Sequence, residues 1–155
     1  MPNYESTAVF KADISSLKKE MQAASRAAKL ADAEFKAATA GMDNWAASAD
    51  GLEAKLTQLD KKLASQKTRY EQQKQVVEAA EKAFGKNSAA ADRERLALLN
   101  MESAMKRTEA EIRKYSADLD EINEASAEAA EGTKKYVSAS VDLTDTIEKQ
   151  EKELD

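Results

Sequence analysis

The sequence of 155 residues contains no cysteine and no histidine. Without cysteine, the chain has no disulfide, no thiol nucleophile and no thiolate metal site. Without histidine, it lacks the usual general base near neutral pH and the commonest metal ligand in proteins. Its carboxylates form no pair in an identifiable pocket-forming context. We therefore expect a protein that is not an enzyme and that has no catalytic, cofactor-binding or metal-binding residues.

Helix-breaking residues and large apolar residues are also scarce. There are only one proline, four glycines and 24 residues of Leu, Ile, Val or Phe, a low apolar content that alone would suggest disorder. Against this, Ala, Glu, Lys, Leu and Arg together make up about 55% of the chain, as in long helices and coiled coils. The composition excludes a β-sandwich, a Rossmann enzyme and a disulfide scaffold. It predicts an all-α protein.

Long apolar runs and a basic excess are absent as well. No run approaches the ~20 apolar residues that span a bilayer, and the first residues lack a signal-peptide pattern. The formal net charge of −5 argues against nucleic acid as a partner. Modest apolar bulk and the lack of a basic helix face argue against binding to a membrane surface. Protein partners, self-association included, are the expectation that remains.

The four glycines mark where we expect helices to end, because glycine costs roughly 1 kcal/mol inside a helix and is favoured just past its end. They are Gly41, Gly51, Gly85 and Gly132. Residues 1–131 are expected to form a helical coiled-coil region, and residues 132–155 a weaker helical or partly disordered segment. The predicted helices lie at about 7–41, 50–84 and 88–131, with a weaker one at about 133–154.

Residues suited to helix capping lie at the two predicted turns. After Gly85, either Asn87 or Ser88 can act as the N-cap of the next helix. In the first turn, Asp50 and Glu53 have the spacing of a capping box. These positions predict a turn before each of the second and third helices.

Apolar residues recur at alternating intervals of four and three residues, the pattern of helices that pack along a seam. Three predicted helices have a strong seam, and the fourth has a marginal one. The predicted seam residues with large side chains are Phe10, Ile14, Leu17, Phe35, Leu52, Leu56, Leu59, Leu63, Tyr70, Val77, Leu98, Met101, Met105, Ile112, Tyr115 and Leu119.

The seams match one another when the chain folds back at the predicted turns. Folding at Lys86 places Leu59 opposite Ile112, and folding at the first turn places Phe10 opposite Phe84. We therefore predict a long antiparallel helical hairpin over 50–122. The first helix either joins it as a three-helix bundle or packs against another chain, and the sequence leaves both open.

Several polar or aromatic residues allow two interpretations. Trp45 in the first turn is better explained as a plug closing the end of the bundle than as a ligand-stacking residue. Gln66 and Gln73, on the seam, either set the helix register or tolerate a partly wet interface. The acidic stretch from Asp118 to Glu131 contains no basic residue. A solvated helix face is favoured there over an electrostatic docking site.

One part of the sequence is more specific than a generic coiled coil. The phrase AEFKAATAGMDNW at 33–45, followed by SADGL at 48–52, resembles the N-terminal region of tail tape measure proteins of long-tailed bacteriophages and prophages. The similarity continues through KRTEAEIRKYSADLDEI at 106–122 and fades after about residue 125. The segment IEKQEKELD at 147–155 also resembles segments of such chains. Because tape measure proteins are much longer, with apolar segments and further domains, we expect this chain to be a fragment.

The resemblance implies a structural role in the virion. A tape measure protein lies in the lumen of the tail tube and sets tail length, while tube subunits polymerise around it in the host cytoplasm. The implied partners are tube, adaptor or tip proteins. The alternative is a cytoplasmic coiled-coil adaptor or a chromosome-maintenance-like arm, although the latter needs a nucleotide-binding head and no GxxxxGK[ST] motif is present.

Overall fold

The computed structural model describes the backbone of residues 4–154 and the side chains of residues 4–131. Three long helices account for nearly all of it: α1 (Tyr4–Thr39), α2 (Ala49–Phe84) and α3 (Ala89–Leu154). A short 3-10 helix, η1 (Trp45–Ala47), lies in the connection between α1 and α2. The described residues contain no strand. The predicted all-α class is confirmed.

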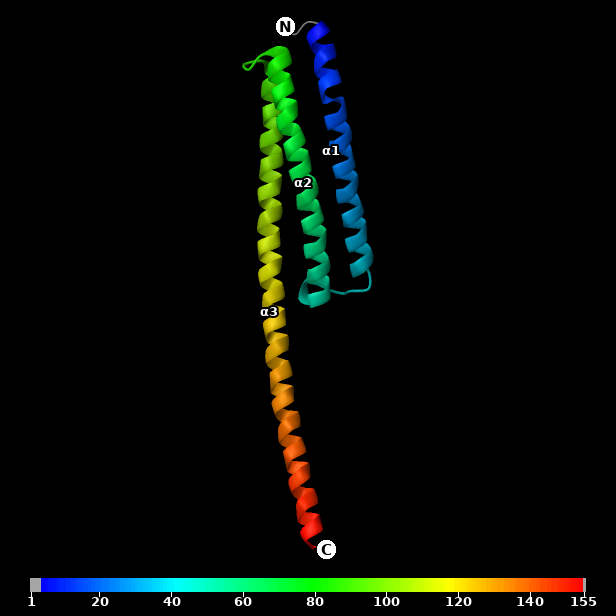
Figure 1. Ribbon diagram of the computed structural model, residues 1–155, viewed down its shortest axis with the longest axis vertical. Helices are drawn as coiled ribbons and strands as arrows, with labels where there is room; N and C mark the ends of the chain where they lie inside the picture. Colours follow the sequence, from blue (N-terminus) through cyan, green and yellow to red (C-terminus); the bar gives the residue numbers. More distant parts are fainter. Residues whose placement is uncertain (1–3, 155) are drawn as a thin grey trace.

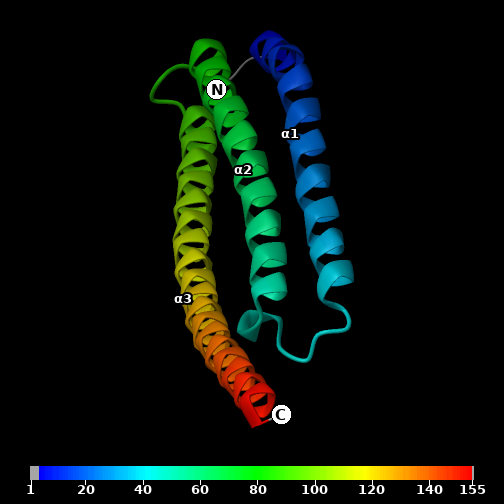
Figure 2. The same ribbon diagram turned by 60° about the horizontal axis from the view of Figure 1, so that its bottom comes forward.

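The three helices run side by side and antiparallel in sequence order, with α2 in the middle (Figures 1 and 2). Helix α2 packs along both neighbours, whereas α1 and α3 share no comparable contact with each other. The predicted hairpin of the second and third helices is therefore present, and α1 packs on α2 of the same chain. The arrangement is an open one in which two helices flank a third.

The core is thin and made largely of small side chains. Leu52 and Leu59 are the largest fully buried residues, and Ala80 and Ala91, from facing helices, are both completely inaccessible to solvent. A buried leucine contributes about 2 kcal/mol and an alanine far less. The scarcity of large apolar residues in the sequence therefore corresponds to close helix packing with few bulky layers, and not to disorder in this part of the chain.

Burial along α1 follows the 4-3 periodicity of the sequence. Ile14, Ala24 and Ala31 are buried. Most other inward positions are half-buried, and the residues between them are exposed, as expected for a helix packed on one side. The apolar stripe of α1 therefore lies against α2.

Helix α2 uses two different stripes for its two neighbours. Ser65, which lies off the predicted seam, is buried and donates a hydrogen bond of 2.6 Å to the Ala24 carbonyl oxygen of α1. Gln73, on the seam, bonds to Glu94 of α3. The sequence pattern predicted that one seam of α2 contacts both α1 and α3, and this prediction is wrong. One residue changes the helix face by about 100°, so two flanking helices require two stripes.

The predicted break at Gly132 is wrong, because α3 is one continuous helix from Ala89 to Leu154. A mid-helix glycine costs only about 1 kcal/mol, and the flanking sequence EAAEGTKKY has no proline and many good helix formers. The weaker helix predicted at 133–154 is therefore the distal part of α3. Its side chains lie outside the described residues, as does Asp155.

Beyond the turn between α1 and α2, α3 continues without a neighbour (Figure 1). Ile122 is the last half-buried residue, and every residue from 123 to 131 is exposed. Helix α3 therefore continues past the packed helices as an overhang, residues 123–154. The overhang contains 32 residues, a length of about 48 Å at 1.5 Å per residue.

Candidate interaction site

An aromatic cluster joins the three long helices at the end where α1 meets α2. Phe35 of α1 and Trp45 of η1 lie edge to face, with ring centroids 5.2 Å apart. Tyr115 of α3 lies 5.5 Å from Trp45, centroid to centroid. The Lys55 ammonium of α2 is 4.8 Å from the Phe35 ring and 5.5 Å from the Trp45 ring, within cation–π range. We call these four residues the aromatic junction.

The local sequence places Trp45 by bringing η1 against the start of α2. The hydroxyl of Ser48 accepts a hydrogen bond of 3.0 Å from the Gly51 backbone N–H, which makes Ser48 the N-cap of α2. At Gly51, an added Cβ would lie 2.1 Å from the Trp45 carbonyl oxygen. Glycine is therefore required for this close approach. The same contact corrects the predicted capping box, because Asp50 lies inside the first turn of α2 and the cap is Ser48.

The turn between α2 and α3 follows the predicted residues closely. Gly85 ends α2 with a positive φ of 100°, a conformation that disfavours other residues. Of the two candidate caps, Ser88 is the one used: its hydroxyl accepts a hydrogen bond of 3.1 Å from the Ala91 backbone N–H. Asn87 lies exposed in the turn. Arg95 spans the turn with a 3.0 Å ion pair to Glu81.

Polar bonds across the helix interfaces supplement the thin apolar core. Gln73 is 3% exposed, and its amide nitrogen donates to the backbone oxygen of Glu94 at 2.9 Å and to its carboxylate at 2.8 Å. Sliding α3 along α2 by one turn would break both bonds. Gln73 therefore makes the contacts expected of a register-setting residue, whereas the buried side-chain oxygen of Gln66 has no partner among the described residues.

All the predicted seam residues are buried or half-buried, and they come from all three long helices. The rings of Phe10 and Phe84 meet edge to face at 5.2 Å, at the opposite end of the molecule from the aromatic junction. The buried positions outside the list of large seam residues are Ala24, Ala31, Gly51, Ser65, Gln73, Val76, Ala80, Ala91 and Thr108. The seam residues are buried at Ile14, Leu52, Leu59 and Val77 and half-buried at Phe10, Leu17, Phe35, Leu56, Leu63, Tyr70, Leu98, Met101, Met105, Ile112, Tyr115 and Leu119.

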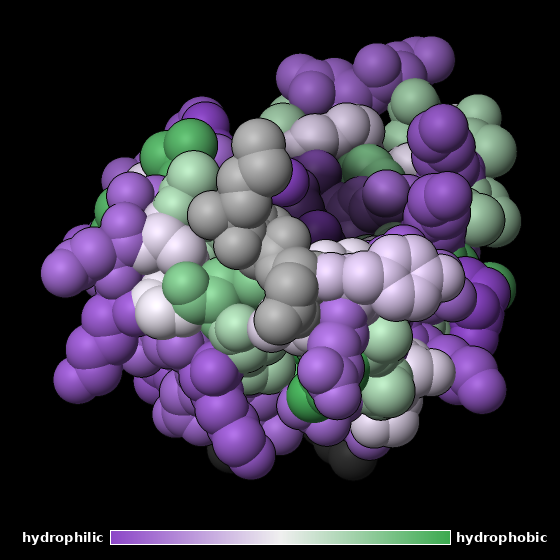
Figure 3. Space-filling model, turned by 90° about the horizontal axis from the view of Figure 1, so that it is seen from above, coloured by the Kyte–Doolittle hydropathy of each residue, from purple (hydrophilic) through white to green (hydrophobic). Residues whose placement is uncertain are grey.

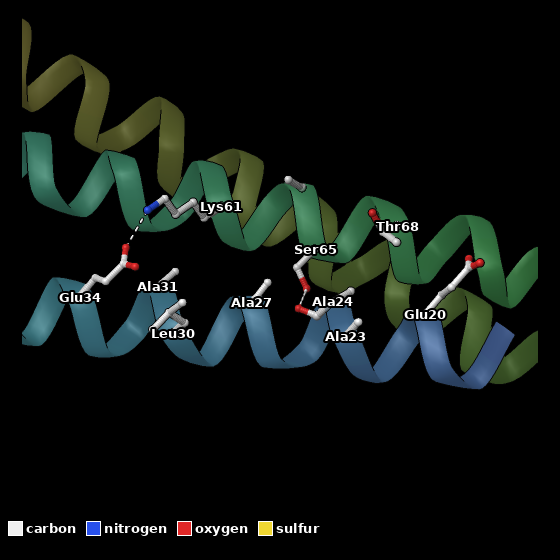
Figure 4. Close-up of a pocket in the computed structure, with 11 residues that line it drawn as sticks. Glu20, Ala23, Ala24, Ala27, Leu30, Ala31, Glu34, Lys61, Ser65 and Thr68 are labelled. Atoms are coloured by element: carbon white, nitrogen blue, oxygen red, sulfur yellow. Dashed lines mark hydrogen bonds and ion pairs between the residues drawn. The ribbon is translucent and has the colours of Figure 1, made fainter. Parts of the chain in front are cut away.

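A shallow apolar groove runs between α1 and α2 (Figure 4). It encloses about 580 Å³, and Ala23, Ala27 and Leu30 line it on the α1 side. Leu30 is 61% exposed. A 2.6 Å ion pair between Lys61 and Glu34 crosses one end of the groove. The groove has few polar groups that could orient a small ligand.

A second groove, on the other side of the α1 seam, has a different character. Its wider part encloses about 1020 Å³ between the start of α1, the turn after α2 and the start of α3. At this end of the molecule, Figure 3 shows a hollow lined by hydrophilic side chains. The groove continues along α1, because Lys18 lines both parts. We call it the basic groove, after the residues that line it: Lys11, Lys18, Arg26, Lys29, Arg69, Lys86 and Arg93.

The described residues contain no cluster of acidic side chains that could hold a metal ion. Within the same part of the chain, no helix has a stretch both long and apolar enough to cross a membrane. The features that stand out are thus surfaces and a junction between helices.

In comparisons with known proteins, no family model, no curated protein and no solved structure matches the chain.

Proposed function

We propose that this chain is a structural protein of a long-tailed phage tail, of the tape measure kind, and that it forms a folded terminal region that anchors the ruler. The supporting sequence is the resemblance at residues 33–45 and 48–52. These residues form the end of α1, η1 and the start of α2. They include Phe35, Trp45 and Gly51, each of which makes a specific contact in the aromatic junction or beside it.

The observation that carries the proposal is the single helix that leaves this junction. Up to about residue 122, α3 packs on α2, and the exposed part that follows has no neighbour among the described residues. A lone helix measures length at about 1.5 Å per residue, whereas a hairpin folds that length back on itself. The hairpin suits an anchor, and the overhang suits the start of a ruler.

The proposed setting follows from the role. The chain would lie in the lumen of the virion tail after assembly in the host cytoplasm. Its partners would be tube, adaptor or tip proteins. A rod of packed helices with exposed polar faces is compatible with such contacts, since it offers a long lateral surface and two distinct ends.

Tail length is the decisive measurement. Matched in-frame deletions of seven residues in α2 and seven in α3 keep the heptad pairing of the hairpin, and electron microscopy measures the tails of the resulting phage. We expect unchanged tail length. A fourteen-residue deletion between 123 and 150, the matched control, should shorten the tail by about 21 Å. Proportional shortening by the hairpin deletions would contradict the anchor role.

Gene neighbourhood tests the broader assignment. Genes for tube, adaptor and tip proteins beside this one would support a tail protein. Their absence would favour the cytoplasmic coiled-coil adaptor instead.

A further inference from the structure

The basic groove concentrates positive charge on one concave surface. Seven lysine and arginine residues line it, and Glu94 is the one acidic residue among its lining residues. The carboxylate of Glu94 already accepts a hydrogen bond from Gln73. Clefts lined by charge of one sign attract partners of the opposite sign. The groove is therefore suited to an acidic partner.

The basic side chains of the groove have no acidic partners within the described part of the chain. None of them takes part in the ion pairs found there, which involve Lys61, Lys74, Arg95 and Lys106 instead. A partner that brings carboxylates to this groove would supply the missing counter-charges without breaking an existing pair.

The end of the packed part of α3 and the overhang that follows carry such carboxylates. Glu121, Glu124, Glu128 and Glu131 follow one another at intervals of three, four and three residues, so they lie on one helix face. All four are exposed, and no ion pair joins them to other described residues. We call these four residues the acidic ridge. Most of the residues between them are small, which permits close approach to another helix.

The groove and the ridge lie at opposite ends of the folded part. The basic groove is widest beside the turn between α2 and α3, whereas the acidic ridge begins at the last packed residues of α3, at the other end of the packed helices, and continues into the overhang (Figure 1). One continuous helix separates the two, so the ridge points away from its own groove. A second copy placed end to end would receive the ridge in its groove without any bending of α3.

The lengths of the two elements are also similar. Helix α1, which walls the groove, has 36 residues, or about 54 Å. The overhang of α3 measures about 48 Å. In an end-to-end pair, the acidic ridge comes first along the overhang and lies beside Lys11, Lys18 and Arg93, where the groove is widest.

We propose that the chain self-associates head to tail, with the acidic ridge of one copy docked in the basic groove of the next. The occupant is a second copy because the same chain carries both complementary surfaces, which differ in charge sign, have similar lengths and lie in the order that an end-to-end pair requires. Such an interface joins different patches of the two copies, so it generates an open filament or a closed ring. The proposal stands independently of the proposed function, since it requires no phage component.

The association should depend strongly on salt, because exposed charges are screened within about 8 Å at physiological ionic strength. Sedimentation velocity of the full chain over about a hundredfold range of concentration measures it directly. We expect species larger than a monomer to increase with concentration in about 50 mM NaCl and to decrease in about 500 mM NaCl.

Charge reversal identifies the two surfaces. The groove variant carries Lys11→Glu, Lys18→Glu and Arg93→Glu, and the ridge variant carries Glu121→Lys, Glu124→Lys and Glu128→Lys. Each alone should weaken association by about tenfold or more, because like charges then face each other. An equimolar mixture should restore association, since each variant then finds the opposite charge on the other. Circular dichroism checks that both variants remain helical.

A control variant changes net charge equally but leaves the groove untouched. Its substitutions, at exposed positions outside the groove, are Lys19→Glu, Lys67→Glu and Lys82→Glu. It should associate as the unmodified chain does. A chain that stays monomeric throughout in low salt would overturn the proposal. A groove variant that associates as the unmodified chain does would also overturn it. So would a mixture of the groove and ridge variants that fails to restore association, the result expected if the groove binds a different acidic protein.

Discussion

At the scale of single residues, the turn between α1 and α2 depends on side chains that are small or absent. Gly51 leaves room for the Trp45 backbone, and Ser48 caps α2 with its hydroxyl. Trp45 can then reach Phe35 and Tyr115 on two other helices. The position of the large Trp45 side chain thus depends on two small residues, Gly51 and Ser48.

Replacing Gly51 with alanine should destabilise the fold even though alanine favours helices. Its Cβ would lie 2.1 Å from the Trp45 carbonyl oxygen, so η1 or α2 must shift, at a cost of about 1–3 kcal/mol. Urea denaturation measures the loss. Gly41→Ala is the matched control: nothing lies within 4 Å of its added Cβ, and stability should change little. Equal effects of the two substitutions would refute this account.

The sequence could identify the turn but not its cap. Asp50 and Ser48 are both common N-cap residue types, and only Ala49 lies between them. The choice depends on which residue has the extended backbone, and that is Ser48, with φ −122° and ψ 148°. The approach of η1 fixes this conformation. Because η1 is held by contacts with three helices, no local pattern reveals it.

Substitution of the two candidate caps should therefore give unequal results. Ser48→Ala removes the hydrogen bond to the Gly51 backbone N–H and should cost about 1 kcal/mol of unfolding free energy. Asp50→Ala removes only an exposed first-turn carboxylate and should cost less, about 0.3–1 kcal/mol at low salt. Thermal unfolding of both variants compares the two losses of stability. A larger loss for Asp50→Ala would indicate that Asp50, in the predicted capping box, is the N-cap.

At the scale of elements, periodicity predicted where helices pack better than where they end. The 4-3 pattern of α1 coincides with its buried face because α1 has one main neighbour. Helix α2 has two neighbours, so Ser65 is buried although it belongs to no apolar stripe. Gly132 does not end α3, because the residues on both sides of it have strong helix propensity. Gly85 does end a helix, through its positive φ.

The two glycines should respond oppositely to alanine. Gly132→Ala lies within α3 and should raise helix content, since alanine is favoured over glycine by about 1 kcal/mol in a helix interior. Gly85→Ala places a Cβ at a φ of 100° and should lower stability by at least that amount. Far-ultraviolet circular dichroism during heating measures both. A loss of helix in Gly132→Ala would indicate a break at that glycine.

At the scale of the whole molecule, the open arrangement makes the helices unequal. Helix α2 has a neighbour on two sides, α1 has one, and the end of α3 described here has none. Local opening is easiest where few buried contacts must be broken. Since α1 does not pack along α3, it can leave without opening the hairpin.

Hydrogen exchange should reveal this order. Backbone amides of α2 between Leu59 and Ala80 should exchange slowest, those of α1 faster, and those of residues 123–131 fastest. Mass spectrometry of peptides from the exchanging chain resolves the three groups. Equal protection of α1 and α2 would show that the three helices open as one unit.

The two complementary surfaces differ in how far a sequence can predict them. The acidic ridge is visible as a run of carboxylates without a basic residue, but without a partner it resembles any solvated helix face. The basic groove is only partly visible in the sequence, because Lys11, Lys18, Arg26 and Lys29 lie on α1 but Arg69, Lys86 and Arg93 come from later parts of the chain. Only the tertiary arrangement brings them to one surface.

Trp45, described above as a packing residue, also gives the molecule an intrinsic fluorescent probe. It is the single indole in the chain, and it is half-buried among groups from three helices. Separation of α1 or α3 from the junction would hydrate the indole and shift its emission to longer wavelength. Fluorescence can therefore follow the opening of this rod without a dye and without introducing a cysteine.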